Sequence, residues 1–193
     1  MIIDSRSKGD EATFLDLDAL RTGLDALPEG RTDIGSVALV VIRGDGGRRE
    51  TPDRVTLHPV DGVRGDAWGR DRRRDILAQI AVMEADVARL ISNGQPLALF
   101  GDALFFDLDL SVENLPPGSR LRVGTALLEV TPQPHTGCSK FRSRFGADAL
   151  RLVSAPDLGH RRLRGVYMRV MDAGVAGPGD VVLVEHRGAA LPR

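Results

Sequence analysis

The chain contains, shortly after its midpoint, the stretch Pro116-Pro-Gly-Ser-Arg-Leu-Arg-Val-Gly-Thr-Ala-Leu-Leu-Glu-Val130. Apolar and polar residues alternate on both sides of Gly124-Thr125, which is the pattern of half-buried strands. The Pro-Pro-Gly sequence at the start of the stretch favours a turn, and a glycine between two strands favours a tight connection. The stretch therefore predicts a β-hairpin.

Further short segments of strand character flank this hairpin. Residues 36–43 are rich in β-branched side chains, and the glycine turn at 44–47 predicts a return strand within residues 48–57. Other strands are expected within residues 97–100, 103–110, 163–170 and 180–185. Many short strands separated by glycine turns predict a mainly β (α+β) fold, a β-barrel with a few peripheral helices.

Helical periodicity occurs in three places. Apolar residues at steps of three and four predict a helix over residues 11–27, which ends before Pro28. A second helix is predicted over residues 76–91, where residues 84–92 carry the clearer pattern and Asn93-Gly94 forms the C-cap. A third, short helix is expected at residues 147–153.

Composition excludes several classes of protein. The chain has 193 residues, which suits one domain, and its 26 basic and 27 acidic residues give a formal charge of -1. This balance predicts no general binding to nucleic acid. The first residues lack the apolar run of a signal peptide, and no stretch approaches the roughly 18 apolar residues of a membrane span. We expect a cytoplasmic protein without a membrane partner.

The single cysteine lies in Thr131-Pro-Gln-Pro-His-Thr-Gly-Cys-Ser-Lys-Phe141. Prolines forbid a helix before Cys138, whereas residues 138–145 contain no helix breaker, so Thr136 or Gly137 is expected to cap a helix with Cys138 in its first turn. Neighbouring cations and a helix N-terminus stabilise a thiolate, which is the nucleophilic and metal-binding form. The alternative is that Cys138 is a small buried hydrophobic residue without chemistry.

A series of ordered motifs now points to a known family. They are Gly65-Asp66, Gly101-Asp102, Asp107-Leu-Asp-Leu-Ser-Val-Glu-Asn-Leu-Pro-Pro-Gly118, Leu121-Arg-Val-Gly124, Leu128-Glu-Val-Thr131, Cys138 and Gly179-Asp180-Val181. In this series the chain resembles the MOSC domain, which is named for the C-terminal domain of molybdenum-cofactor sulfurases. The resemblance covers about residues 34–185 and implies three parts: a helical extension at 1–30, the MOSC domain at 31–187 and a tail at 188–193.

The resemblance implies a β-barrel that binds molybdenum cofactor, a molybdopterin, with Cys138 as the catalytic residue and metal ligand. It also implies a set of cofactor-binding residues, namely Arg64, Asp66, Asn114, His135, Thr136, Lys140 and Arg144. Each of these has an alternative structural role: Asn114 as a turn residue, His135 and Thr136 as loop-shaping residues, and the cations as surface charges. Asp66 is expected to orient a neighbouring arginine. Trp68 stands where many relatives carry histidine, and an indole cannot exchange a proton as imidazole does.

Three functions follow from the resemblance. The first is a molybdenum-dependent oxidoreductase that reduces N-hydroxylated small molecules with a separate electron donor, because one cysteine cannot hold an iron–sulfur cluster. The second is a sulfur carrier that receives sulfur from a donor protein as a Cys138 persulfide and passes it to a metal–sulfur cofactor. The third is a non-catalytic binding module. Pyridoxal phosphate is associated with the family only through a different domain, and this chain shows no site for it.

Overall fold

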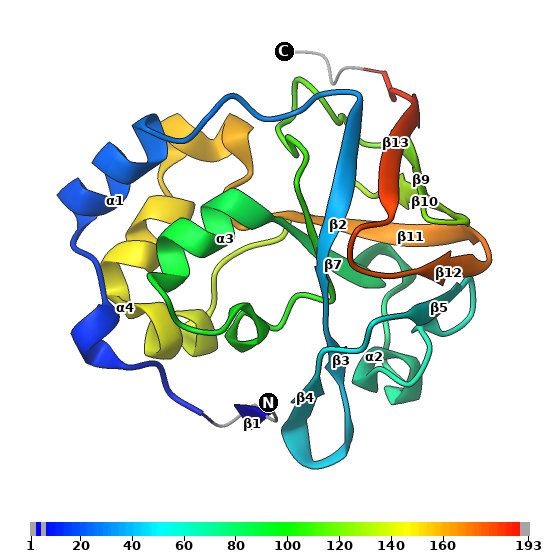
Figure 1. Cartoon of the computed structure of the whole chain (residues 1–193), viewed down its shortest axis with the longest axis horizontal. Helices are drawn as coiled ribbons and strands as arrows, with labels where there is room; N and C mark the ends of the chain where they lie inside the picture. Colours follow the sequence, from blue (N-terminus) through cyan, green and yellow to red (C-terminus); the bar gives the residue numbers. More distant parts are fainter. Residues whose placement is uncertain (1–2, 5–6, 190–193) are drawn as a thin grey trace.

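Seven strands form a closed barrel in the computed structural model, which describes residues 3–4 and 7–189 (Figure 1). The strands are β2 (Ile34–Val40), β7 (Ile80–Glu84), β8 (Leu104–Phe106), β9 (Arg120–Val123), β10 (Ala126–Val130), β11 (Val166–Asp172) and β13 (Val181–His186). Their order around the barrel is β10-β11-β7-β8-β2-β13-β9, and β7 and β8 pair in parallel. The predicted hairpin at Gly124 is the antiparallel β9–β10 pair, in which Leu121 lies opposite Leu128. The prediction of a mainly β barrel with a few helices is confirmed.

Alternating side chains fill the barrel interior. Along β9 and β10 the buried positions are separated by exposed or half-buried ones, as the sequence pattern predicts. Leu121, Val123 and Leu128 have no exposed surface, and each contributes about 1.5–3 kcal/mol through burial of its apolar side chain.

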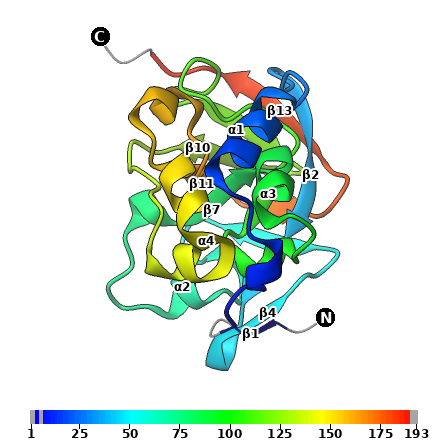
Figure 2. The same ribbon diagram turned by 90° about the vertical axis from the view of Figure 1, so that its left-hand side faces the viewer.

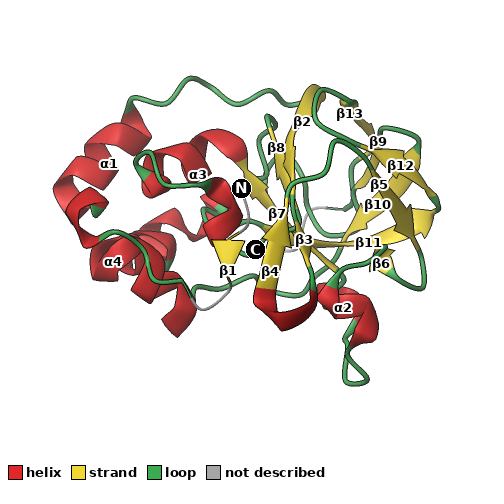
Figure 3. Ribbon diagram, turned by 60° about the horizontal axis from the view of Figure 1, so that its bottom comes forward, coloured by secondary structure: helices red, strands yellow, loops and turns green. Residues whose placement is uncertain are grey.

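A helical layer covers one side of the barrel (Figures 2 and 3). It consists of α1 (Leu17–Asp25), α3 (Ala85–Ser92) and α4 (Ser139–Val153), and it encloses a second apolar core. Asp16 caps α1 by accepting a hydrogen bond from the Ala19 N–H at 2.8 Å, so the helix begins later than residue 11. Residues 11–13 instead form a 3₁₀ turn, η1 (Glu11–Thr13). Within the described ranges, every helix is too short or too polar to span a bilayer.

Two small sheets extend from the barrel. The first sheet has the strand order β1-β4-β3 and consists of β1 (Ile3–Asp4), β3 (Ile42–Arg43) and β4 (Arg48–Glu50). The second sheet has the order β12-β5-β6 and consists of β5 (Val55–His58), β6 (Gly62–Val63) and β12 (Gly174–Ala176). The second predicted hairpin exists, but only as the β3–β4 pair. Its expected return strand is interrupted near Pro52, which cannot donate to a ladder, and β5 pairs in the other sheet.

The prediction of one helix over residues 76–91 is wrong in its first half. Residues 76–78 form a 3₁₀ turn, η3 (Ile76–Ala78), and residues 80–84 form barrel strand β7. Four successive residues of β7, residues 80–83, are buried, because the strand has the barrel interior on one face and the helical layer on the other. A continuous apolar run of this kind has no period that separates strand from helix.

The other elements follow the predictions in part. Residues 97–99 form a 3₁₀ turn, η4 (Leu97–Leu99), and not a strand, whereas β8 lies inside the predicted segment 103–110. The expected helix at 147–153 is the second half of α4, which is broken at Gly146. The remaining elements are α2 (Ala67–Arg70), η2 (Asp45–Gly47) and η5 (Pro156–Arg161). Most of the predicted tail at 188–193 lies outside the described residues.

Candidate functional site

A cleft of about 710 Å³ lies where the β3–β4 hairpin, the α2 loop, the 135–138 loop and the start of α4 approach one another. We call it the arginine cleft, because seven cations from distant parts of the sequence line it. They are Arg43, Arg49, Arg73, Arg74, Lys140, Arg144 and Arg164. The charge balance of the whole chain gives no sign of this concentration.

Asp66 fixes one arginine of the cleft. It is buried at the N-cap of α2, where it accepts a hydrogen bond from the Trp68 N–H at 2.8 Å. The same carboxylate accepts from the backbone N–H, Nε and Nη2 of Arg43 at 2.8, 3.0 and 2.6 Å. Burial lowers the pKa of Arg43, but the hydrogen bonds and charge of Asp66 outweigh it, so the pKa is raised. Asp66 therefore orients a neighbouring arginine.

Asp102 fixes a second arginine. Its side chain is fully buried, and Nη1 of Arg164 donates to both carboxylate oxygens at 2.9 and 2.7 Å. The Arg164 guanidinium also lies 5.3 Å from the centroid of the Phe141 ring. Gly101, at φ 93°, turns the chain before Asp102, and a Cβ there would come within 3.4 Å of the Arg49 guanidinium.

Arg49 and Arg144 are buried in the same wall, at 4% and 3% exposure. Arg49 donates to the Ala98 carbonyl and Arg144 to the Leu99 carbonyl, the latter at 2.8 Å. Burial, followed by the charges of Arg144 and Arg43, lowers the pKa of Arg49 to about 10. Burial also lowers the pKa of Arg144, and the charge of Cys138 acts against it. Both guanidinium groups stay charged at neutral pH.

The inner wall holds an excess of positive charge. Asp66 pairs with Arg43 and Asp102 pairs with Arg164, whereas the buried Arg49 has no carboxylate partner in the described part of the chain, so its positive charge is uncompensated there. Buried cations of this kind are costly unless a counter-charge accompanies them. An anion in the cleft would supply it.

Four buried side-chain nitrogens have no hydrogen-bond partner among the described residues, and all belong to residues that line this cleft. They are Arg49 Nε, Trp68 Nε1, His135 Nδ1 and Arg164 Nε. Buried polar groups normally find partners, so a cluster of exceptions in one cavity indicates a missing ligand or water. At least three of these nitrogens are obligatory donors, which points to a ligand rich in acceptors.

His135 lies in the cleft wall with only 6% of its side chain exposed. Its ring packs on Tyr167, with 4.3 Å between centroids, and its Nδ1 lies 3.6 Å from Asp102 Oδ1. Burial lowers the pKa of His135 to about 4 in spite of the Asp102 charge, so the ring is neutral at pH 7.

Cys138 is exposed at the cleft and precedes α4 as its N-cap residue. The expected position in the first helical turn, with Thr136 or Gly137 as the cap, is wrong. Cys138 has extended dihedral angles, and Gly137 instead allows close packing, because a Cβ there would come within 2.3 Å of Leu150. The alternative of a buried hydrophobic cysteine is also contradicted. The Cys138 side chain makes no capping hydrogen bond among the described residues, so the thiol is available for other chemistry.

The structure brings most of the predicted site residues together. Cys138, His135, Thr136, Lys140 and Arg144 line the arginine cleft, and Asp66 lies directly behind it.

Arg64 and Asn114 do not belong to the cleft lining. Arg64 is exposed and lies 3.5 Å from Asp61. The side-chain Nδ2 of Asn114 donates to the Asp109 backbone carbonyl at 2.8 Å, and its side-chain Oδ1 accepts from Nη2 of Arg187 at 2.9 Å. Asn114 therefore acts as a turn residue that secures its own loop.

Sequence reasoning did not identify several residues of the site. They are Arg43, Arg49, Asp102, Arg164 and Tyr167. The arginines lie on a hairpin and beside a strand, where a charged residue normally faces water. The sequence feature that could have indicated Asp102 is the pair Gly101-Asp102, because a glycine at positive φ followed by a carboxylate is typical of a constrained turn.

No group of three or more His, Cys, Asp or Glu side chains in the described part of the chain could hold a metal ion. The cleft therefore offers one thiol and many cations, and a metal would have to bring most of its own ligands.

Comparison with known proteins identifies the fold independently. The sequence model of the MOSC domain matches residues 77–183. No curated protein matches the chain significantly. Among solved structures, a protein described as hypothetical aligns with a TM-score of 0.58 and 21% identity over 82% of this chain and 70% of its own. YiiM from Escherichia coli aligns with a TM-score of 0.54 and 20% identity over 79% of this chain and 71% of its own. YuaD from Bacillus subtilis aligns with a TM-score of 0.50 and 16% identity over 77% of this chain and 94% of its own.

Proposed function

The chain belongs to the MOSC domain family, and from this premise we propose that the arginine cleft binds molybdenum cofactor with Cys138 as the metal ligand. The protein then acts as an oxidoreductase on N-hydroxylated compounds. The family is generally associated with this cofactor, and the geometry of the cleft supports the assignment.

The main support for this proposal is the set of buried hydrogen-bond donors that have no partner among the described residues. Arg49 Nε, Arg164 Nε and Trp68 Nε1 are donors without acceptors among the described residues, in a wall where the charge of Arg49 has no carboxylate partner among those residues. A phosphate-bearing pterin supplies both the charge and the acceptors. Arginine suits this role because its planar guanidinium binds phosphate oxygens in pairs.

The donor set also fits the metal. A single exposed thiol cannot by itself hold an ion, but a soft thiolate suits one position of a metal that arrives with sulfur ligands of its own. When bound, the cofactor supplies the two-electron redox chemistry that removal of oxygen from an N-hydroxylated compound requires.

The remaining residues position these groups. Asp66 holds Arg43, and Asp102 holds Arg164, so the guanidinium groups are oriented before any ligand arrives. His135 is neutral at pH 7 and offers a hydrogen bond without adding charge. Trp68 supplies an indole N–H and an apolar surface against which Arg74 stacks at 5.4 Å.

A sulfur carrier is the second candidate, and the exposure of Cys138 favours it. In this reaction the Cys138 thiolate attacks the outer sulfur of a donor's persulfide, the new S–S bond forms, and the donor's thiolate leaves. An exposed thiolate beside cations is suited to such exchange. The same cleft then presents the persulfide to a metal–sulfur cofactor.

We place this activity in the cytoplasm. A free exposed cysteine persists in a reducing compartment such as the cytoplasm. Electrons come from a separate donor protein, because one cysteine cannot hold an iron–sulfur cluster. We assign residues 1–30 to a helical extension, residues 31–187 to the MOSC domain and residues 188–193 to a tail.

Reduction of an N-hydroxylated substrate, such as benzamidoxime, tests the enzyme function. The protein is purified from a host that makes molybdenum cofactor and assayed with a chemical electron donor. We expect the amidine product from the parent and none from Cys138→Ala. Intact mass distinguishes the alternatives: a gain of one sulfur on Cys138 without reduction supports the carrier. If the protein yields no amidine and Cys138 gains no sulfur, both functions are contradicted, and a binding module is the remaining candidate.

A further inference from the structure

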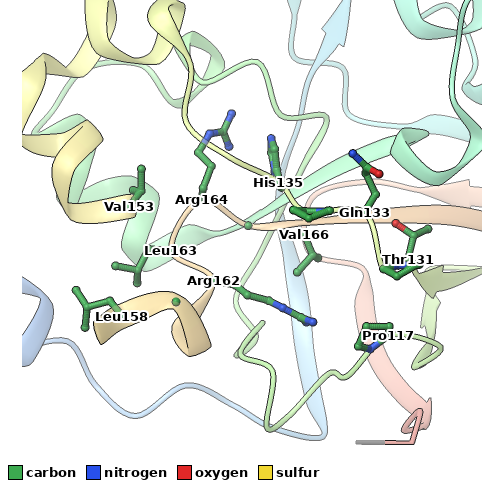
Figure 4. Close-up of a pocket in the computed structure, with 14 residues that line it drawn as sticks. Pro117, Thr131, Gln133, His135, Val153, Leu158, Arg162, Leu163, Arg164 and Val166 are labelled. Carbon is green, nitrogen blue, oxygen red and sulfur yellow. The ribbon is translucent and has the colours of Figure 1, made fainter. Parts of the chain in front are cut away.

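A second cavity, which we call the Arg162 pocket, lies beside the arginine cleft. Its volume is about 270 Å³, and its lining includes the Pro132-Gln133-Pro134 segment, η5 and the start of β11. Two residues, His135 and Arg164, line both cavities. Figure 4 shows their side chains pointing the same way, away from Arg162, so they turn their backbones to this pocket.

The walls of the pocket are mostly apolar. Leu158, Leu163 and Val166 contribute aliphatic side chains, and three prolines contribute ring surface. Thr131 offers no free hydroxyl, because its Oγ1 donates to the Leu77 carbonyl. Pockets of this kind bind apolar groups and use a small number of polar side chains to orient them.

Arg162 is the charged group of the pocket. Its side chain reaches toward Pro117, between the aliphatic wall and Thr131 (Figure 4). Nη1 donates to the Leu115 carbonyl at 2.6 Å. Nε and Nη2 have no hydrogen-bond partner in the described part of the chain, and neither atom is buried, so both remain open to a ligand or to water.

The backbone at Arg162 is also unusual. It has φ 48° and ψ 47°, the left-handed conformation that a long side chain rarely adopts. Arg162 is the C-cap of η5, where its backbone N–H donates to the Gly159 carbonyl, and this cap fixes the direction in which the side chain leaves the helix. Burial lowers the pKa of Arg162 while Glu113 acts in the opposite direction, which indicates an incompletely compensated cation.

We propose that the Arg162 pocket binds a small aromatic carboxylate, with the ring against the aliphatic wall and the carboxylate paired with Nε and Nη2 of Arg162. Two donors on one edge of a guanidinium match the two oxygens of a carboxylate. The volume admits a single or fused ring and excludes a pterin cofactor with its phosphate. The pocket is therefore distinct from the arginine cleft, and the proposal does not depend on cofactor binding.

The test is a titration of the full-length protein, without cofactor, with benzoate, followed by amide NMR. Sulfate is present at saturation so that the arginine cleft is already occupied by an anion. We expect benzoate to shift the amide signals of Gly159 and Gly165, which line the pocket, and to leave those of Gly44 and Gly101 unchanged. Benzamide, which has the same ring without the charge, is expected to bind at least about tenfold more weakly.

Variants make the assignment specific. Arg162→Gln is expected to weaken benzoate binding at least about tenfold, whereas Arg162→Lys retains part of the affinity and Arg161→Gln, at the adjacent arginine outside the pocket, retains all of it. Leu158→Trp, which fills the pocket from its half-exposed side, abolishes binding. Equal affinity in Arg162→Gln, shifts confined to Gly44 and Gly101, or no shift at any benzoate concentration overturns the proposal.

Discussion

Asp102 is the residue on which the inner wall of the arginine cleft depends. It is the only carboxylate that Arg164 contacts among the described residues, and both groups are buried. Removing one member of such a pair leaves an uncompensated buried charge. Breaking the pair is therefore expected to cost more stability than the intact pair contributes.

Asp102→Asn is expected to lower the free energy of unfolding by about 3 kcal/mol, because the Arg164 charge loses its partner. Chemical denaturation at pH 7 measures this change. The control is Asp157→Asn, which removes an exposed partner of Arg21 and should leave stability unchanged. Equal effects of the two substitutions would show that Asp102 is not an important counter-charge.

His135 predicts a pH dependence of stability. Its pKa is about 4 in the folded protein and about 6.5 in an unfolded chain, so the unfolded state binds the extra proton between these values. The contribution of neutral His135 is fully present above pH 6.5 and is lost as pH falls toward 4, by up to about 3 kcal/mol.

We expect the free energy of unfolding of the parent to fall more steeply between pH 6.5 and 4 than that of His135→Gln. Denaturant titrations at several pH values compare the two slopes. Parallel curves would mean that His135 titrates alike in the folded and unfolded states, contrary to its burial between Tyr167 and Asp102.

The sequence predicted the cleft residues that surround Cys138, because cations close to a cysteine in the chain are close to it in space. It could not predict Arg49, because in the run Arg48-Arg49-Glu50 nothing distinguishes the buried charge from its exposed neighbours. Burial there depends on the Ala98 carbonyl and Gly101, which lie about fifty residues away.

At the scale of elements, α4 shows how one residue shapes the helical layer. Gly146 interrupts the helix at φ 92°, and a Cβ there would lie 3.0 Å from the Phe14 ring. Phe141 and Phe145 before the break and Leu152 after it all reach the second core. The glycine at the break lets Phe14 pack directly against the helix backbone.

Gly146→Ala is expected to destabilise the protein more than Gly94→Ala. Both glycines have positive φ, at 92° and 87°, so both substitutions carry a backbone penalty of about 1–3 kcal/mol, and the penalty is larger at Gly146 because its ψ of 169° lies in a region almost confined to glycine. Only at Gly146 does the new methyl group meet a neighbour, since no atom in the described part of the chain lies within 4 Å of a Cβ at Gly94. Thermal unfolding of the two variants measures the difference, and equal losses would exclude a role for Phe14.

Strand β7 marks the limit of sequence reasoning about elements. The barrel hairpin at Gly124 was predictable because each strand has one buried and one exposed face. Strand β7 is buried on both faces, between the barrel core and the helical layer, so periodicity could not separate it from the helix that follows.

At the scale of the whole molecule, the arginine cleft exists because the barrel supplies a rigid rim. The β3–β4 hairpin, the α2 loop and α4 approach it from separate parts of the chain, and each brings at least one arginine. No single stretch of sequence contains the site. The fold class follows from local patterns, whereas the charge of the cleft emerges only when these elements meet.

The central claim is that the arginines hold the cofactor phosphate while Cys138 holds the metal. Molybdenum and pterin, counted separately in protein purified from a host that makes the cofactor, test it most directly. We predict both at similar amounts in the parent, pterin with little molybdenum in Cys138→Ala, and loss of both in Arg49→Met. Thr125→Ala, remote from the cleft, serves as the control and should match the parent. Unchanged pterin in folded Arg49→Met, or unchanged molybdenum in Cys138→Ala, would contradict the account.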